Sequence, residues 1–231
     1  MPLPIYLAMT AAEFRQKSSF SGSIAWMACH FSPYGTGLSG HPETLPAGSM
    51  LIVNDRTPVC GHDPALITSQ LVQLVEQFGC SRVLLDLQRP GEAETVQIVK
   101  AVLKALPCPV GVSECYAENL SCPVFLPPVP LLQSPEAYLA PWVQREIWLE
   151  TALSCGSYQV SAQGCRSLPY SPGEKQNIRR DDRLFCQYSI ESGKDTVTFS
   201  LTRTAADLQA LYQAVEPLGV SCLVGLYQEL G

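Results

Sequence analysis

Polar side chains end several short apolar runs in this chain, and they are the residues best suited to chemistry. Such runs are typical of parallel strands that are buried on both faces. Parallel strands of one sheet end at the same edge, so their terminal polar residues should gather at one rim. These candidate site residues are His30, Asn54, Asp55, Arg56, Asp86, Gln88, Arg89, Glu114 and Glu150.

Asp86 and Glu114 are the strongest candidates for catalysis, because they end two neighbouring predicted strands. With strands about 4.8 Å apart, we expect their carboxyl groups to lie about 5–9 Å from each other. This range covers the carboxyl separations of both retaining and inverting glycosidases. Like charges at such distances raise the pKa of one group and create an acid–base pair. The alternative is a structural network in which each carboxylate pairs with Arg56 or Arg89.

Several further residues are candidates for substrate binding. Tyr34 and Tyr116 follow predicted strands and are placed to stack on a sugar face, and Glu150 ends a late strand, where some barrel glycosidases have a nucleophile. The cluster at 54–56 binds substrate or stabilises its loop through a salt bridge. His30 is a candidate base, or it is a rim residue whose hydrogen bonds are satisfied within the protein.

The pattern of elements predicts one domain over 1–231, a somewhat irregular α/β barrel of the (β/α)8 TIM type. Helices are expected at 64–78, 92–106 and 205–218, with reduced helices after the fifth strand. A hairpin is expected in the C-terminal third, and 167–182 reads as an exposed loop. The barrel strands are expected at 5–9, 24–30, 50–53, 83–87, 110–113, 123–126, 146–149 and 220–226.

The composition limits the classes of partner. The 231 residues are 46% hydrophobic and carry a net charge of −6 without a long basic run. Nucleic acid and anionic membranes are therefore disfavoured as partners. We expect a cytoplasmic protein whose ten cysteines are mostly free thiols, because they are scattered and many have apolar neighbours. No metal or cofactor is expected, because the cysteines and histidines lack ligand spacing.

The segment from Ser81 to Pro90, SRVLLDLQRP, resembles the strand-4 motif of the family 18 glycoside hydrolases, the chitinase-like barrels. That family carries D-x-x-D-x-D-x-E there, commonly followed by Tyr-Pro. Alignment on the proline places Asp86 at the last aspartate and Gln88 at the catalytic glutamate. Ser81 and Leu84 stand where the other two aspartates belong.

The resemblance implies a barrel that binds or processes carbohydrate but is degenerate at the usual catalytic glutamate. In the family that glutamate protonates the leaving oxygen and the N-acetyl group of the substrate is the nucleophile, which an amide at Gln88 cannot support. The expected partner is a saccharide or another neutral, hydroxyl-rich molecule. Two alternatives stay open: an active glycosidase using Asp86 and Glu114, and a non-catalytic scaffold or protein-interaction barrel.

Overall fold

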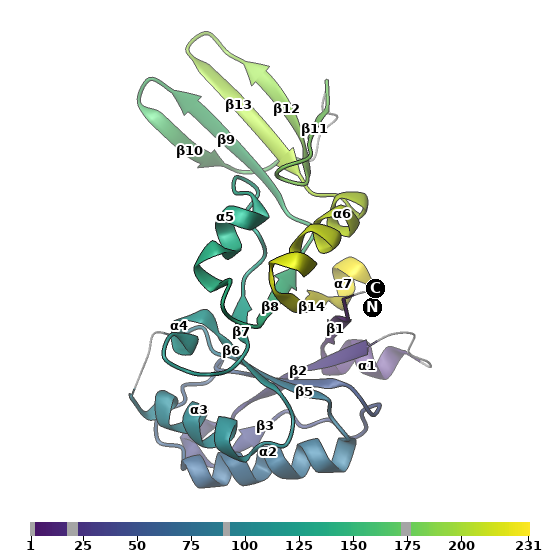
Figure 1. The fold of residues 1–231 in the computed structure, drawn as a ribbon, viewed down its shortest axis with the longest axis vertical. Helices are drawn as coiled ribbons and strands as arrows, with labels where there is room; N and C mark the ends of the chain where they lie inside the picture. Colours follow the sequence, from purple (N-terminus) through teal and green to yellow (C-terminus); the bar gives the residue numbers. More distant parts are fainter. Residues whose placement is uncertain (1–2, 18–22, 90–92, 172–176) are drawn as a thin grey trace. The chain divides into compact units, whose positions relative to one another are not determined.

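Eight parallel strands form a closed barrel in the computed structural model, which describes residues 3–17, 23–89, 93–171 and 177–231 (Figure 1). The strands follow one another around the barrel in chain order, and β1 closes it by pairing with both β2 and β14. The predicted (β/α)8-like fold is therefore confirmed. The barrel strands are β1 (Ile5–Met9), β2 (Ser23–Phe31), β4 (Met50–Asn54), β5 (Arg82–Asp86), β6 (Val110–Ser113), β7 (Val124–Leu126), β8 (Ile147–Thr151) and β14 (Val220–Leu226).

The strands β4, β5 and β6 are parallel neighbours, as the sequence predicts. In the register of β4 and β5, Asn54 lies opposite Asp86. In the register of β5 and β6, Leu85 lies opposite Val112. The carboxyl ends of these three strands therefore meet at one rim of the barrel.

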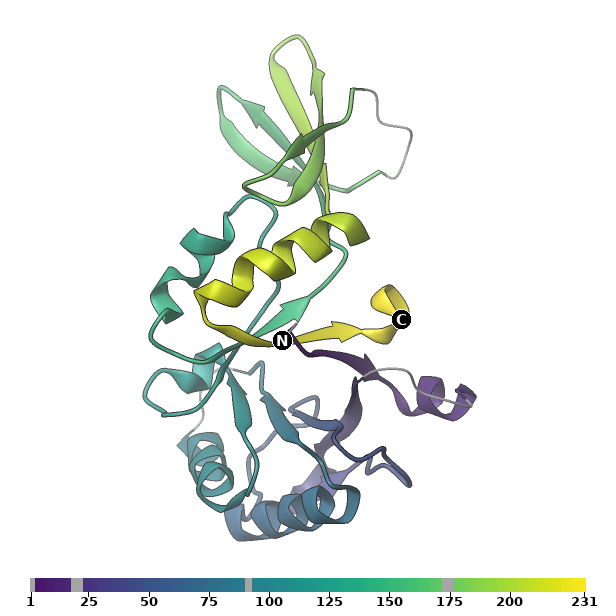
Figure 2. The same cartoon turned by 45° about the vertical axis from the view of Figure 1, so that its right-hand side comes forward.

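The helices between the strands are unequal, which makes the barrel irregular. The long helices α2 (Pro64–Phe78) and α3 (Ala93–Ala105) pack side by side (Figures 1 and 2). By contrast, α4 (Glu114–Ala117) has only four residues. Between β2 and β4 the described chain forms η1 (Pro33–Gly35) and the short strand β3 (Leu38–Ser39) instead of an α-helix. The remaining helices are α1 (Ala11–Gln16), α5 (Pro135–Leu139), α6 (Ala205–Val215) and α7 (Tyr227–Leu230).

Local signals in the sequence set the helix ends. Thr10 and Glu13 form a capping box at the start of α1. At the start of α2, the side chain of Asp63 accepts a hydrogen bond from the Ala65 backbone N–H. That helix ends at Gly79, whose φ of 60° is a left-handed conformation that glycine adopts without steric cost.

Side chains fill the interior of the barrel below the rim. Trp148 of β8 is fully buried there and donates a hydrogen bond from Nε1 to Glu146 Oε1, 3.1 Å away. Gly111 of β6 makes room for the indole ring, because a Cβ at this position would lie 2.2 Å from Trp148 Cε3. The interior is thus a packed core. Its buried residues are Tyr6, Ala8, Ala25, Met50, Ile52, Leu84, Phe125, Trp148, Cys222 and Val224.

A second, antiparallel sheet occupies the C-terminal third, with the strand order β10-β9-β13-β12-β11. The predicted hairpin is present as β12 and β13. The segment 167–182 is not wholly a loop, because it contains the end of β10 and the short strand β11. The strands are β9 (Cys155–Ser161), β10 (Gly164–Leu168), β11 (Arg179–Asp181), β12 (Cys186–Ser192) and β13 (Thr196–Thr202).

The contacts between Cα atoms divide the chain into two compact units. One comprises Met1–Pro127, Gln144–Glu150 and Val220–Gly231, and the other comprises Pro128–Val143 and Thr151–Gly219. The single domain expected over 1–231 stays a prediction.

Candidate functional site

A small cavity opens at the carboxyl end of the barrel and has a volume of about 90 Å³. Three polar residues line it: Asn54 from β4, Asp86 from β5 and Glu150 from β8. The cavity therefore combines two carboxyl groups with an apolar wall. The other residues of that wall are Ala8, Met27, Ile52, Leu84, Phe125, Val224, Gly225 and Leu226.

Asp86 reaches the cavity because of the alternation of β5. It lies two residues after Leu84, which belongs to the barrel interior, so both side chains point inward. Gln88 Nε2 donates a hydrogen bond to Asp86 Oδ1, and Ser113 Oγ lies 3.4 Å from the same oxygen. Burial raises the pKa of Asp86, the two hydrogen bonds oppose this rise, and the charge of Asp55 adds to it.

Glu150 lines the same cavity from β8, which lies three strands away from β5 around the barrel. It lies two residues after the interior Trp148 of β8. Burial raises the pKa of Glu150, and the negative charges of Asp86 and Glu229 raise it further. Neither a hydrogen bond nor a cation is among the groups that shift this pKa in the described part of the chain. The second carboxyl group of the cavity is therefore Glu150.

Asn54 and Asp55 have structural tasks at the rim. Asn54 Nδ2 donates hydrogen bonds to the carbonyl oxygens of Met27 and Cys29, both 3.1 Å away, where the pairing of β2 with β4 shifts register. Asp55 is buried, and its Oδ2 accepts hydrogen bonds from the backbone N–H groups of Gln88 and Arg89, at 3.0 and 2.8 Å. Asp55 thus holds the start of the loop that follows β5.

Glu114 does not line the cavity. It is exposed and is the first residue of α4, which begins directly after β6. The inward residue at the end of β6 is Ser113, whose Oγ is 2.9 Å from the Leu87 backbone N–H that donates to it. Of the residues expected to gather at the rim, Asp86 lines the cavity, whereas Asp55, Gln88 and Glu114 do not.

The candidate basic residues also lie outside the cavity lining. Arg56 and Arg89 are exposed, and Arg89 Nη2 donates a hydrogen bond to the Arg56 carbonyl, 3.2 Å away. Neither takes part in an ion pair among the described residues, so the alternative of a rim ion network is not supported. His30 is half-buried, and its Nδ1 lies 2.9 Å from the Ala28 carbonyl oxygen.

Of the two aromatic candidates, Tyr116 is the one whose side chain is described. Tyr116 is buried, and its hydroxyl donates a hydrogen bond to the Arg89 carbonyl, 2.7 Å away, so its ring is not presented to a ligand. Tyr34 lies in η1, but its side chain lies outside the described residues. Pro90, on which the family motif was aligned, also lies outside them.

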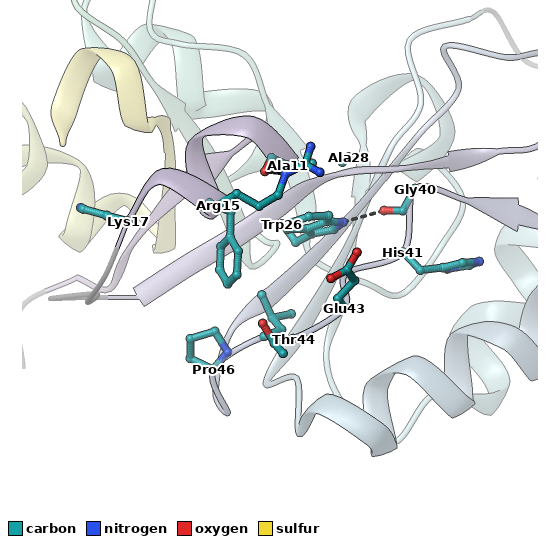
Figure 3. A pocket seen from close by; sticks show the side chains of 12 residues that line it. Ala11, Arg15, Lys17, Trp26, Ala28, Gly40, His41, Glu43, Thr44 and Pro46 are labelled. Atoms are coloured by element: carbon teal, nitrogen blue, oxygen red, sulfur yellow. Dashed lines mark hydrogen bonds between the residues drawn. The ribbon is translucent and has the colours of Figure 1, made fainter.

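A larger pocket of about 590 Å³ lies on the outer side of β2 (Figure 3). Residues of α1 and of the segment 40–46 form its other walls, where no α-helix separates β2 from β4 in the described chain. Trp26 is only 5% exposed here; its Nε1 donates to the Gly40 carbonyl 2.8 Å away, and its ring meets Phe14 edge-on. Trp26 thus belongs to the core, and the candidate site residues do not line this pocket.

The described residues contain no group of three or more histidine, cysteine, aspartate or glutamate side chains that would hold a metal ion. Within the same residues, no helix is both long and apolar enough to span a membrane. All ten cysteines are unpaired.

The fold is similar to that of several solved carbohydrate-active proteins. They include a family 18 N-acetylglucosaminidase from Paenibacillus barengoltzii (TM-score 0.62, 7% identity, 98% of this chain and 95% of that one). A second is a Glu-to-Gln mutant of the class V chitinase from Nicotiana tobaccum in complex with NAG4. Its TM-score is 0.59 at 10% identity, and the match covers 97% of this chain and 93% of that one. A third is a chitinase-like agglutinin from Robinia pseudoacacia. Its TM-score is 0.52 at 10% identity, and the match covers 95% of this chain and 93% of that one.

No protein-family model matches the sequence, and no curated protein matches it either. The resemblance to the family 18 barrels is thus confirmed at the level of the fold. The fold similarity covers nearly the whole chain, although the motif that suggested it spans only Ser81 to Pro90.

Proposed function

We propose that this protein is a carbohydrate-binding barrel, degenerate at the usual catalytic glutamate, that takes N-acetylated saccharides at the carboxyl end of its strands. The observation that carries the proposal is the cavity shared by Asp86 and Glu150. Asp86 stands at the aspartate position of the family motif. Gln88, at the glutamate position, makes a direct hydrogen bond to it. The similarity in fold to proteins named for N-acetylglucosamine and chitin supports this class of ligand.

The size and lining of the cavity favour a small substituent as the group that enters it. A volume of 90 Å³ is well below the roughly 300–1,000 Å³ of typical pockets that enclose a small-molecule ligand. An acetamido group is compact, with an apolar methyl group and a polar amide. Met27, Phe125 and Val224 supply apolar surface for the methyl group, and the carboxyl groups supply partners for the amide. The sugar ring would then lie over the mouth.

Binding without hydrolysis follows from the chemistry of Gln88. An amide donates and accepts hydrogen bonds but does not release a proton to a leaving oxygen near neutral pH. The alternative of a glycosidase using Asp86 and Glu114 finds no support, because Glu114 lies outside the cavity that holds Asp86. One of the proteins of similar fold is named a chitinase-like agglutinin, which is in line with a binding role for this barrel.

Calorimetric titration with N-acetylglucosamine tetramers, beside glucose tetramers as a control, tests the proposal. We expect binding of the acetylated ligand only, without release of shorter products. Asp86→Ala should abolish binding, whereas Glu114→Gln changes an exposed carboxylate outside the cavity and should leave binding unchanged. Wild-type protein that binds neither oligosaccharide would refute the carbohydrate function and favour the scaffold alternative.

We also propose the cytoplasm as the location. Ten unpaired cysteines in 231 residues suit a reducing compartment, because disulfides form and persist in oxidising ones. Fractionation of cells that express the untagged protein tests this location.

A further inference from the structure

We infer that Glu150 is a specificity-determining residue that binds the ligand in its protonated form. Its carboxylic acid donates a hydrogen bond to the carbonyl oxygen of the acetamido group, while the Asp86 carboxylate accepts one from the acetamido N–H. The inference rests on the proposed function and adds a residue from β8 that the strand-4 motif does not contain.

The amide of an acetamido group needs two different partners in one small space. Its N–H must meet an acceptor and its carbonyl oxygen must meet a donor, because a buried amide without partners is costly. Asp86 and Glu150 both line the cavity of about 90 Å³. Two ionised carboxylates offer acceptors only, whereas a singly protonated pair offers one acceptor and one donor. The third polar residue, Asn54, uses its amide N–H groups on the carbonyl oxygens of Met27 and Cys29.

The surroundings of the two carboxyl groups decide which of them keeps the proton. Gln88 and Ser113 donate hydrogen bonds to Asp86, and such bonds favour its ionised form. Glu150 has no hydrogen bond among the groups that shift its pKa. The charged groups that act on Glu150 are Asp86 and Glu229, and the charged group that acts on Asp86 is Asp55. All of these charged groups are acidic, so they favour protonation of the pair. Hydrogen bonds oppose protonation at Asp86 but not at Glu150, so Glu150 is the member that keeps the proton.

Ligand affinity should therefore depend on pH in a defined way. Above the pKa of Glu150 in the free protein, binding requires uptake of one proton. The association constant then falls about tenfold for each pH unit. Below that pKa, affinity stays level until Asp86 is protonated as well. Glucose oligomers lack the amide and should not bind at any pH in this range.

Titration calorimetry with the N-acetylglucosamine tetramer from pH 5 to 8.5 tests the inference. Wild-type affinity should fall with rising pH, and proton uptake should appear as a dependence of the binding heat on the ionisation enthalpy of the buffer. Glu150→Gln supplies a permanent N–H donor, so its affinity should stay within about threefold across the range. Glu150→Ala removes the donor and should weaken binding about tenfold at pH 5. Glu114→Gln is the matched control and should keep the wild-type profile.

The two levels of proposal fail in different ways. Wild-type binding with the same affinity at every pH, or a Glu150→Gln variant with the wild-type slope, would overturn the role of Glu150 and leave the glycan function standing. Absence of wild-type binding at every pH would overturn the function itself. Circular dichroism of each variant at both ends of the pH range confirms that the compared proteins are folded.

Discussion

At the scale of single residues, Gln88 opposes the effect of burial on the pKa of Asp86. Its side chain is exposed and donates a hydrogen bond that lowers the pKa of this carboxyl against the effect of burial. Gln88→Ala should therefore raise the pKa of Asp86, which a titration of the carboxyl ¹³C resonances measures directly. Gln144, exposed and lining a different pocket, offers a matched control, and Gln144→Ala should leave this pKa unchanged. An unchanged pKa in Gln88→Ala would mean that the hydrogen bond has no influence in solution.

Also at the scale of residues, the buried carboxyl of Glu150 should cost the protein stability. Its pKa is raised in the folded state, so the cost is fully present above the folded pKa and fades as the pH falls toward the unfolded value. Glu150→Gln should thus raise the melting temperature at pH 8 by about 2–4 °C for each kcal/mol of penalty removed. At pH 4 the difference should be small. Thermal melts of both proteins at the two pH values check this, and a gain that is larger at pH 4 would contradict the assignment.

At the scale of elements, the sequence is enough to predict the barrel strands, but not which side chains line the cavity at the rim. The buried runs of β4, β5 and β6 are recognisable because parallel strands are apolar on both faces. Glu114, expected beside Asp86, does not line the cavity, because α4 begins at this residue and the last inward position of β6 is Ser113. Asp86 and Glu150 line one cavity because the sheet curves into a barrel, and no local sequence pattern encodes that curvature.

The start of the loop after β5 is held in part by one buried carboxylate. Asp55 accepts hydrogen bonds from two consecutive backbone N–H groups of this loop. Asp55→Ala should cost about 1–3 kcal/mol in the free energy of unfolding, because both donors lose their partner. It should also weaken glycan binding, because Gln88, which donates to Asp86, is one of the loop residues that Asp55 holds. Asp55→Asn keeps an acceptor oxygen and should cost clearly less in denaturant unfolding; equal losses would show that charge, and not the acceptor, is what matters.

At the scale of the whole molecule, the least predictable part was the antiparallel sheet. Its strands β10 and β11 are short and mostly exposed, so they lack the apolar alternation that marks a strand. Arg203, fully buried in this unit, donates to the carbonyl oxygens of Val129, Leu184 and Phe185. A charged residue in such a place has no signal in the sequence, because its partners come from distant segments and are backbone groups.

The chain passes between the two compact units four times, at 127–128, 143–144, 150–151 and 219–220. The barrel strand β14 is therefore separated from β8 by most of the second unit, and the barrel closes only when β14 pairs with both β8 and β1. Loss of the second unit would leave a long disordered loop to be closed, at an entropic cost that opposes independent unfolding. We therefore predict one cooperative transition, as for a single domain over 1–231.

Trp26 and Trp148 lie in the first unit and Trp142 in the second, so fluorescence can be assigned to one unit by substitution. In Trp142→Phe, tryptophan fluorescence reports only the first unit, whereas far-ultraviolet circular dichroism reports both. The two denaturation curves should share one midpoint and one slope. Since Trp142 is half-buried, its replacement should shift both curves together. Separate midpoints, with the circular dichroism curve in two steps, would show that the antiparallel sheet and its helices unfold as a domain of their own.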